Sequence, residues 1–133
     1  PIEKVLSTGN ERVLATERGT TFGYGALVVD MLSLATMRGF GVPVIFDATH
    51  AVQQPGDDET GGNRTDAALL MRSAAAVGVD GFFAETHPDP ERALSDGATS
   101  IPLGEMYDLL ESAKEIHDLV GARSSNPGNR SGR

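Results

Sequence analysis

Short apolar runs that end in charged or imidazole side chains recur along this chain, with helical patterns between them. Arg18 ends the segment V-L-A-T-E-R, His50 ends V-I-F-D-A-T-H, and Glu85 ends F-F-A-E. These positions recur at intervals of roughly 30 to 35 residues, about the length of one strand-plus-helix unit. Such units join parallel strands through a helix, so the pattern predicts an α/β fold with a parallel sheet.

The apolar runs predict three strands, at residues 13–16, 43–46 and 82–84. Helical spacing of apolar residues predicts helices at 2–7, 27–37, 65–77 and 103–120, and a brief helix at 91–94. No hairpin signal separates the strands, so parallel pairing is the economical arrangement. Three strands form an open sheet and cannot close a barrel by themselves. We expect one domain over residues 1–122 and a disordered Ser, Asn, Gly and Arg tail at 123–133.

Charge and composition exclude several classes of partner. The formal net charge of −8 argues against binding to nucleic acid or to an anionic membrane surface. No apolar run approaches the roughly 18 residues that a membrane span needs. The absence of cysteine fits a reducing compartment, so we expect a cytoplasmic protein. The chain begins at Pro1 inside a helical pattern, which we interpret as a cut within a longer protein.

Because the carboxyl ends of parallel strands lie on one side of a sheet, we expect His50, Glu85 and Asp96 to converge. One imidazole and two carboxylates are a suitable ligand set for a divalent metal. Each residue also has an ordinary interpretation when it is taken alone. Glu85 could form an ion pair with Arg18 or Arg64, and Asp96 lies in S-D-G, a common turn sequence.

Arg18 has two interpretations as well. It could form a surface ion pair with Glu17 or another neighbour, or its guanidinium could bind a phosphate or carboxylate bidentately. The Gly-rich loop at residues 19–25 lacks G-K-[ST] and is therefore not a P-loop. The polar loop at residues 47–63 is too long for a simple connector, which makes it a candidate lid.

Several segments of the chain are similar in sequence to one enzyme family. They are T-E-R-G-T-T-F-G-Y, L-V-V-D-M, V-I-F-D-A-T-H-A-V-Q, A-V-G-V-D-G-F-F-A-E-T-H-P-D-P and A-L-S-D-G. They closely resemble the 3-deoxy-D-manno-octulosonate-8-phosphate synthase family, which joins phosphoenolpyruvate to D-arabinose 5-phosphate. The similarity runs in order from about Ile2 to Val120. The family fold is a TIM (β/α)8 barrel of about twice this length, so the resemblance implies its C-terminal part, about three βα units.

The resemblance also implies roles for individual residues. Arg18 would bind the phosphate of phosphoenolpyruvate, and Gln53 would lie near the substrates. The divalent metal would be held by His50, Glu85 and Asp96, of which His50 and Asp96 would be catalytic. The loop at residues 55–64 would be the mobile loop that closes over the site.

Further implications concern the metal and the assembly. Metal-independent members usually read C-D-G where this chain has Ser95 before Asp96 and Gly97, so Ser95 favours the metal-dependent class. A fourth ligand, a Cys of the first barrel strand, would lie upstream, and this segment alone would be inactive. The resemblance implies a cytoplasmic homotetramer in lipopolysaccharide biosynthesis that acts on phosphorylated small molecules. Two alternatives stay open, namely a heptulosonate-phosphate synthase and a non-catalytic barrel fragment that serves as an interaction module.

Overall fold

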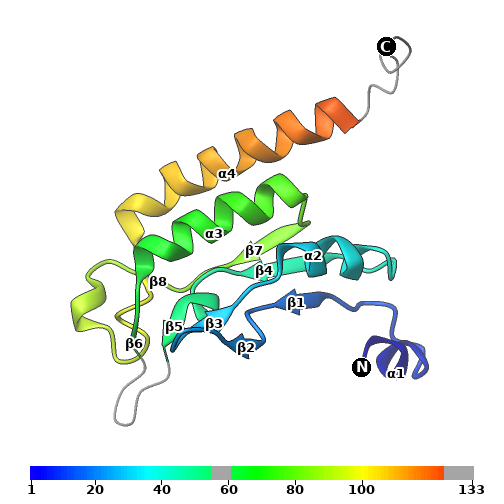
Figure 1. Cartoon of the computed structure of the whole chain (residues 1–133), viewed down its shortest axis with the longest axis horizontal. Coiled ribbons are helices and arrows are strands. Elements are labelled where there is room, and N and C mark those ends of the chain that lie inside the picture. Colours follow the sequence, from blue (N-terminus) through cyan, green and yellow to red (C-terminus); the bar gives the residue numbers. More distant parts are fainter. Residues whose placement is uncertain (55–60, 125–133) are drawn as a thin grey trace.

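The computed structural model describes residues 1–54 and 61–124 (Figure 1). Its central sheet is parallel, with strands in the order β1 (Ala15–Glu17), β4 (Val44–Asp47) and β7 (Gly81–Phe83). In the register of this sheet Ile45 lies between Thr16 and Gly81. The three predicted parallel strands are confirmed, with bounds shifted by one or two residues.

Helices α2 (Met31–Arg38) and α3 (Arg64–Val77) pack near the sheet, and α4 (Leu103–Ser124) packs against α3 (Figure 1). A short helix, α1 (Ile2–Leu6), precedes β1. Phe46, Leu34 and Met71 are fully buried and join β4, α2 and α3 in one core. Burying a side chain of this size contributes about 1.5–3 kcal/mol. This core fixes β4, from whose carboxyl end His50 follows.

Helix α2 begins later than the apolar pattern predicts. The predicted helix at 27–37 was wrong at its start, because Leu27–Val28 forms strand β3 instead. Asp30 is the N-cap of α2, and its carboxylate accepts the Leu32 N–H at 2.9 Å. An Asp that satisfies a free N–H in this way favours a helix start at the next residue.

Two short antiparallel ladders contradict the expected absence of hairpins. Strand β2 (Thr21–Phe22) pairs with β3, and β5 (Gln53–Gln54) pairs with β6 (Gly61–Gly62). Strands of two residues are too short to show alternation in the sequence. The candidate lid is residues 47–63 by loop length and residues 55–64 by family resemblance. Residues 55–60 of both ranges lie outside the described part of the chain.

A further parallel pair was not predicted. Strand β8 (Thr86–His87) follows β7 closely and pairs with β9 (Ile101–Pro102). A two-residue strand containing Pro gives no strand signal, because Pro lacks the N–H that a ladder uses. The β8–β9 connection holds a 3-10 turn, η2 (Pro90–Arg92), near the predicted brief helix at 91–94. The same connection carries Asp96, which therefore lies between strands β8 and β9.

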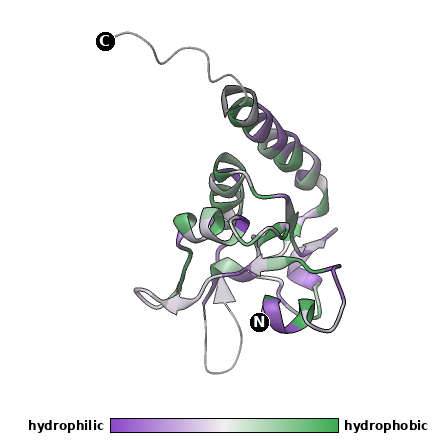
Figure 2. Cartoon of the chain, turned by 90° about the vertical axis from the view of Figure 1, so that its right-hand side faces the viewer, coloured by the Kyte–Doolittle hydropathy of each residue, from purple (hydrophilic) through white to green (hydrophobic). Residues whose placement is uncertain are grey.

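The long helix α4 alternates hydrophobic and hydrophilic positions along its length (Figure 2). On its exposed side Lys114 hydrogen-bonds Asp118, which raises the pKa of Lys114 and lowers the pKa of Asp118. Within residues 1–54 and 61–124 no helix is long and apolar enough to cross a membrane. Helix α4 extends to Ser124, beyond the predicted end at 120, and residues 125–133 of the predicted tail lie outside the described residues.

Candidate functional site

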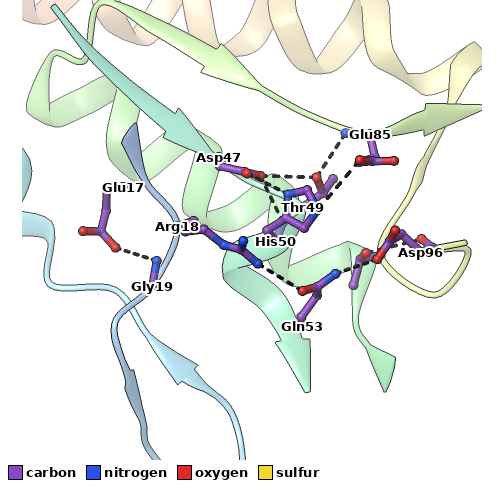
Figure 3. A network of polar contacts seen from close by, with 10 residues as sticks. Glu17, Arg18, Gly19, Asp47, Thr49, His50, Gln53, Glu85 and Asp96 are labelled. Atoms are coloured by element: carbon purple, nitrogen blue, oxygen red, sulfur yellow. Dashed lines mark hydrogen bonds and ion pairs between the residues drawn. The ribbon is translucent and has the colours of Figure 1, made fainter. Parts of the chain in front are cut away.

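The ends of the parallel strands bring side chains from distant parts of the sequence together (Figure 3). Arg18 directly follows β1, His50 begins the turn η1 (His50–Val52) after β4, and Glu85 lies between β7 and β8. Asp96 reaches the same place from the β8–β9 connection. The predicted convergence of His50, Glu85 and Asp96 is confirmed.

One ligating atom from each of these three residues lies within 4.8 Å of the other two. The His50 Nε2 atom lies 3.8 Å from Glu85 Oε1, and all three residues are half-buried. An imidazole nitrogen and two carboxylate oxygens suit a borderline divalent ion such as Zn²⁺, Fe²⁺ or Mn²⁺. Carboxylates that face each other at this distance repel, and a cation between them removes that repulsion. The donor set therefore fits a divalent metal.

A buried carboxylate sets the orientation of the His50 ring. Asp47 Oδ2 lies 2.7 Å from His50 Nδ1, and Asp47 Oδ1 accepts the backbone N–H of His50 at 3.1 Å. Because an ionised carboxylate only accepts hydrogen bonds, Nδ1 carries the proton, and the Nε2 lone pair is free for a metal. The ring also stacks on Phe83, with centroids 5.8 Å apart and an interplanar angle of 28°.

The Asp96 loop has an uncommon backbone conformation. Asp96 has a φ of +53°, in the left-handed region that Asp tolerates better than most side chains. Its carbonyl accepts the N–H groups of Thr99 at 3.1 Å and Ser100 at 2.8 Å, which closes the loop. From helix α3, Arg64 donates to the Gly97 carbonyl at 3.1 Å and pairs with Glu91 at 2.7 Å. These contacts hold the Asp96 carboxylate beside His50.

Gln53 joins the cationic and acidic parts of the site. Its amide nitrogen donates to Asp96 Oδ1 at 2.6 Å, and its amide oxygen accepts from Arg18 Nη2 at 3.4 Å. The two contacts use opposite ends of one side chain, and Figure 3 shows Gln53 between its two partners. Gln53 thus links the candidate anion-binding residue to a candidate metal ligand.

Among the residues that the structure describes, neither Arg18 nor Glu85 forms the ion pair of its ordinary interpretation. Glu17 is buried and accepts the Gly19 N–H at 2.5 Å, so it does not pair with Arg18. Among the described residues, Glu85 forms no ion pair with Arg18 or Arg64; its Oε1 lies 3.8 Å from His50 Nε2, and Arg64 pairs with Glu91. Within residues 1–54 and 61–124 Arg18 has no ion-pair partner and donates to the neutral Gln53, so among these residues its charge is available for an anion.

Two functional candidates, Asp47 and Thr49, were not singled out from the sequence. Thr49 is fully buried, and its hydroxyl accepts the backbone N–H of Glu85 at 3.0 Å. The sequence segment D-A-T-H could have indicated Asp47, because this carboxylate ends a strand three residues before His50. At that spacing a turn can bring the two side chains together.

Comparison with known proteins assigns the family. The profile of the DAHP synthetase I family matches residues 1–122. The chain belongs to this family. It is 59% identical over 121 residues to 2-dehydro-3-deoxyphosphooctonate aldolase of Syntrophotalea carbinolica, covering 90% of this chain and 44% of that protein. The protein of the same name from Thiobacillus denitrificans is 54% identical over 124 residues, covering 92% of this chain and 44% of that protein.

A comparison with solved structures identifies the fold. The crystal structure of phospho-2-dehydro-3-deoxyheptonate aldolase (DAHP synthase) from Thermotoga maritima matches with a TM-score of 0.77 and 31% identity. The match covers 90% of this chain and 33% of that one. The parallel strand–helix units therefore correspond to part of a TIM barrel, which confirms the expected fold class and the resemblance. The chain spans less than half the length of the curated relatives that it matches.

Proposed function

We propose that this chain forms part of a (β/α)8 barrel that condenses phosphoenolpyruvate with D-arabinose 5-phosphate. The products would be 3-deoxy-D-manno-octulosonate 8-phosphate and phosphate. One observation carries the proposal: His50, Glu85 and Asp96 converge in a chain that is 59% identical to an octonate aldolase. In TIM barrels the active site lies at this end of the strands. Because the chain spans 44% of that relative, the activity belongs to the complete barrel.

The proposed reaction forms one carbon–carbon bond and one carbon–oxygen bond to the oxygen of water, and it breaks the carbon–oxygen bond to phosphate. The enol-ether carbon of phosphoenolpyruvate attacks the sugar aldehyde, whose oxygen takes up a proton and becomes a hydroxyl group. Water adds to the resulting cationic carbon and loses a proton. Inorganic phosphate then leaves by C–O cleavage, and a ketone forms. No Schiff-base lysine takes part, so the residues of the site act by positioning and by charge.

Each residue of the site has a part in this proposal. Arg18 binds the phosphate of phosphoenolpyruvate. Gln53 positions the Arg18 guanidinium relative to Asp96, because it hydrogen-bonds both side chains. His50, Glu85 and Asp96 would hold the divalent metal, with a Cys from the first barrel strand as fourth ligand. A metal bound there would orient the aldehyde or the water and lower the pKa of that water.

Replacing Arg18 with alanine should raise the KM for phosphoenolpyruvate on the order of 100-fold, the equivalent of about 3 kcal/mol for a lost charged hydrogen-bond donor. The Arg18→Lys variant keeps the charge but loses the bidentate fork, so its loss should be smaller. Steady-state kinetics on the complete barrel measure both. Arg12→Ala serves as the matched control, since Arg12 is an exposed arginine six residues earlier. A KM in Arg18→Ala equal to that of the control would remove Arg18 from the substrate site.

The test of the function is the choice of aldehyde. The complete barrel is incubated with phosphoenolpyruvate and either arabinose 5-phosphate or erythrose 4-phosphate, and phosphate release is followed. We expect release with the pentose phosphate. Release with erythrose 4-phosphate alone would assign the heptulosonate activity, for which the DAHP synthase structure at 31% identity is the supporting observation. No release with either aldehyde would favour a non-catalytic interaction module.

The proposal also covers the cellular location and the oligomeric state of the enzyme. We place it in the cytoplasm as a homotetramer that supplies lipopolysaccharide biosynthesis. The net charge of −8 in this part of the barrel is unfavourable for binding to an anionic membrane. Sedimentation analysis of the complete barrel checks the tetramer.

A further inference from the structure

Beneath the candidate metal ligands lie two buried polar residues, Asp47 and Thr49. Asp47 is 6% exposed and Thr49 is 0% exposed. They stand at the end of β4, where the chain leaves the sheet and enters the turn that begins at His50. A buried carboxylate and a buried hydroxyl are costly unless each is hydrogen-bonded. The hydrogen-bond partners of Asp47 and Thr49 therefore indicate the role of these two residues.

Thr49 supplies a hydrogen-bond acceptor just beyond the end of the ladder between β4 and β7. The last register pair is Asp47 with Phe83, and the Ala48 N–H then donates to the Phe83 carbonyl at 3.0 Å. Beyond that point the Glu85 N–H donates to the Thr49 hydroxyl at 3.0 Å. A side chain thus replaces the carbonyl that a continued ladder would supply. The backbone of Glu85 is fixed by this bond.

The same hydroxyl connects Glu85 to the partner of His50. Thr49 Oγ1 accepts the Glu85 N–H. The hydroxyl proton of Thr49 is therefore left to donate to Asp47 Oδ1, at the long distance of 3.5 Å. Asp47 in turn holds the His50 ring nitrogen at 2.7 Å and the His50 N–H at 3.1 Å. The path from Glu85 to His50 therefore runs through two buried side chains, neither of which is a candidate metal ligand.

We propose that Thr49 is a positioning residue for the metal site. Its hydroxyl, together with Asp47, sets the backbone of Glu85 and the ring of His50 in their relative places before a metal enters. Outer partners of this kind orient the ligands, and their loss typically lowers metal affinity about 10- to 100-fold. This inference rests on the proposed metal site at His50, Glu85 and Asp96.

The test compares Thr49→Val with Thr49→Ser in the complete barrel, with Co²⁺ as the probe. Valine has nearly the shape of threonine but leaves the Glu85 N–H without its acceptor. We expect Thr49→Val to bind Co²⁺ about 10- to 100-fold more weakly and with an altered visible absorption spectrum. Thr49→Ser keeps the hydroxyl and should retain both the affinity and the spectrum of the unmodified protein.

A matched control separates positioning from general stability. Leu34→Val removes one methylene from the fully buried core in α2, so it should lower stability without changing Co²⁺ affinity. If Thr49→Val does not fold, Asp47→Asn tests the same unit, because the two His50 N–H groups bind different oxygens of Asp47 and Asn replaces one of these oxygens with an NH2 donor. Unchanged Co²⁺ affinity and spectrum in the folded variant would overturn the positioning role alone. Failure of the unmodified protein to bind Co²⁺ would overturn the metal site itself.

Discussion

Replacing His50 with alanine is expected to lower the affinity of the complete barrel for a divalent metal by more than about 100-fold, since loss of an outer-shell partner alone lowers it about 10- to 100-fold. His50 supplies the one nitrogen ligand of the group and is the residue that Asp47 orients. The remaining carboxylates, Glu85 and Asp96, would leave a harder and less selective oxygen site. Metal content after dialysis and an equilibrium metal titration measure the loss.

The effect of the His50 variant has to be separated from the effect on folding. Alanine leaves the buried Asp47 without the ring N–H, so stability should fall as well. Asp96→Asn provides a second variant, because Asn also tolerates the φ of +53° while it removes the ligand charge. His87→Ala is the control, since His87 lies in β8 and is not a member of the converging group. Full activity of His50→Ala in metal-free buffer would show that the assignment is wrong.

The parallel sheet could be predicted because its strands are continuous apolar runs. The run P-V-I-F around β4 is typical of a strand that is covered on both faces, and Phe46 is indeed fully buried. The elements that were missed are those whose stability comes from the tertiary structure. Strand β9 has a single buried apolar residue, Ile101, and forms because β8 offers a parallel partner. A strand that forms only by pairing with its neighbour has no hydrophobic periodicity in its sequence from which it could be predicted.

The site was predictable in its positions but not in its contacts. Arg18, His50 and Glu85 follow strands in the sequence, so topology alone brings them to one edge. Asp96 arrives from a loop, and its place depends on a left-handed backbone and on Arg64. The hydrogen bonds of a side chain such as Gln53 depend on distances across the fold, which a linear pattern does not contain.

A glycine beside the site should be as important as any of the polar residues. A Cβ atom at Gly62 would lie 2.3 Å from Thr99 Cγ2 and 2.7 Å from the Val52 carbonyl oxygen. Contacts this short force the β5–β6 hairpin or its neighbours to move. Gly62→Ala should therefore lower the free energy of unfolding by about 1–3 kcal/mol, the usual cost of an overpacked site. Denaturant unfolding of the complete barrel measures this change.

The same substitution should disturb the chemistry through Gln53, which is the register partner of Gly62 in the hairpin. A shift of β5 moves the Gln53 amide away from Asp96 Oδ1, now 2.6 Å distant, so both metal affinity and phosphoenolpyruvate binding should weaken. Gly61→Ala is the matched control, because its nearest contact would be an ordinary 3.8 Å to the Gln54 carbonyl oxygen. Thr99→Ser removes one of the two clashing atoms and should partly restore Gly62→Ala. If the two glycine variants prove equally stable and equally active, close packing of the hairpin against Thr99 has no role in holding the site together.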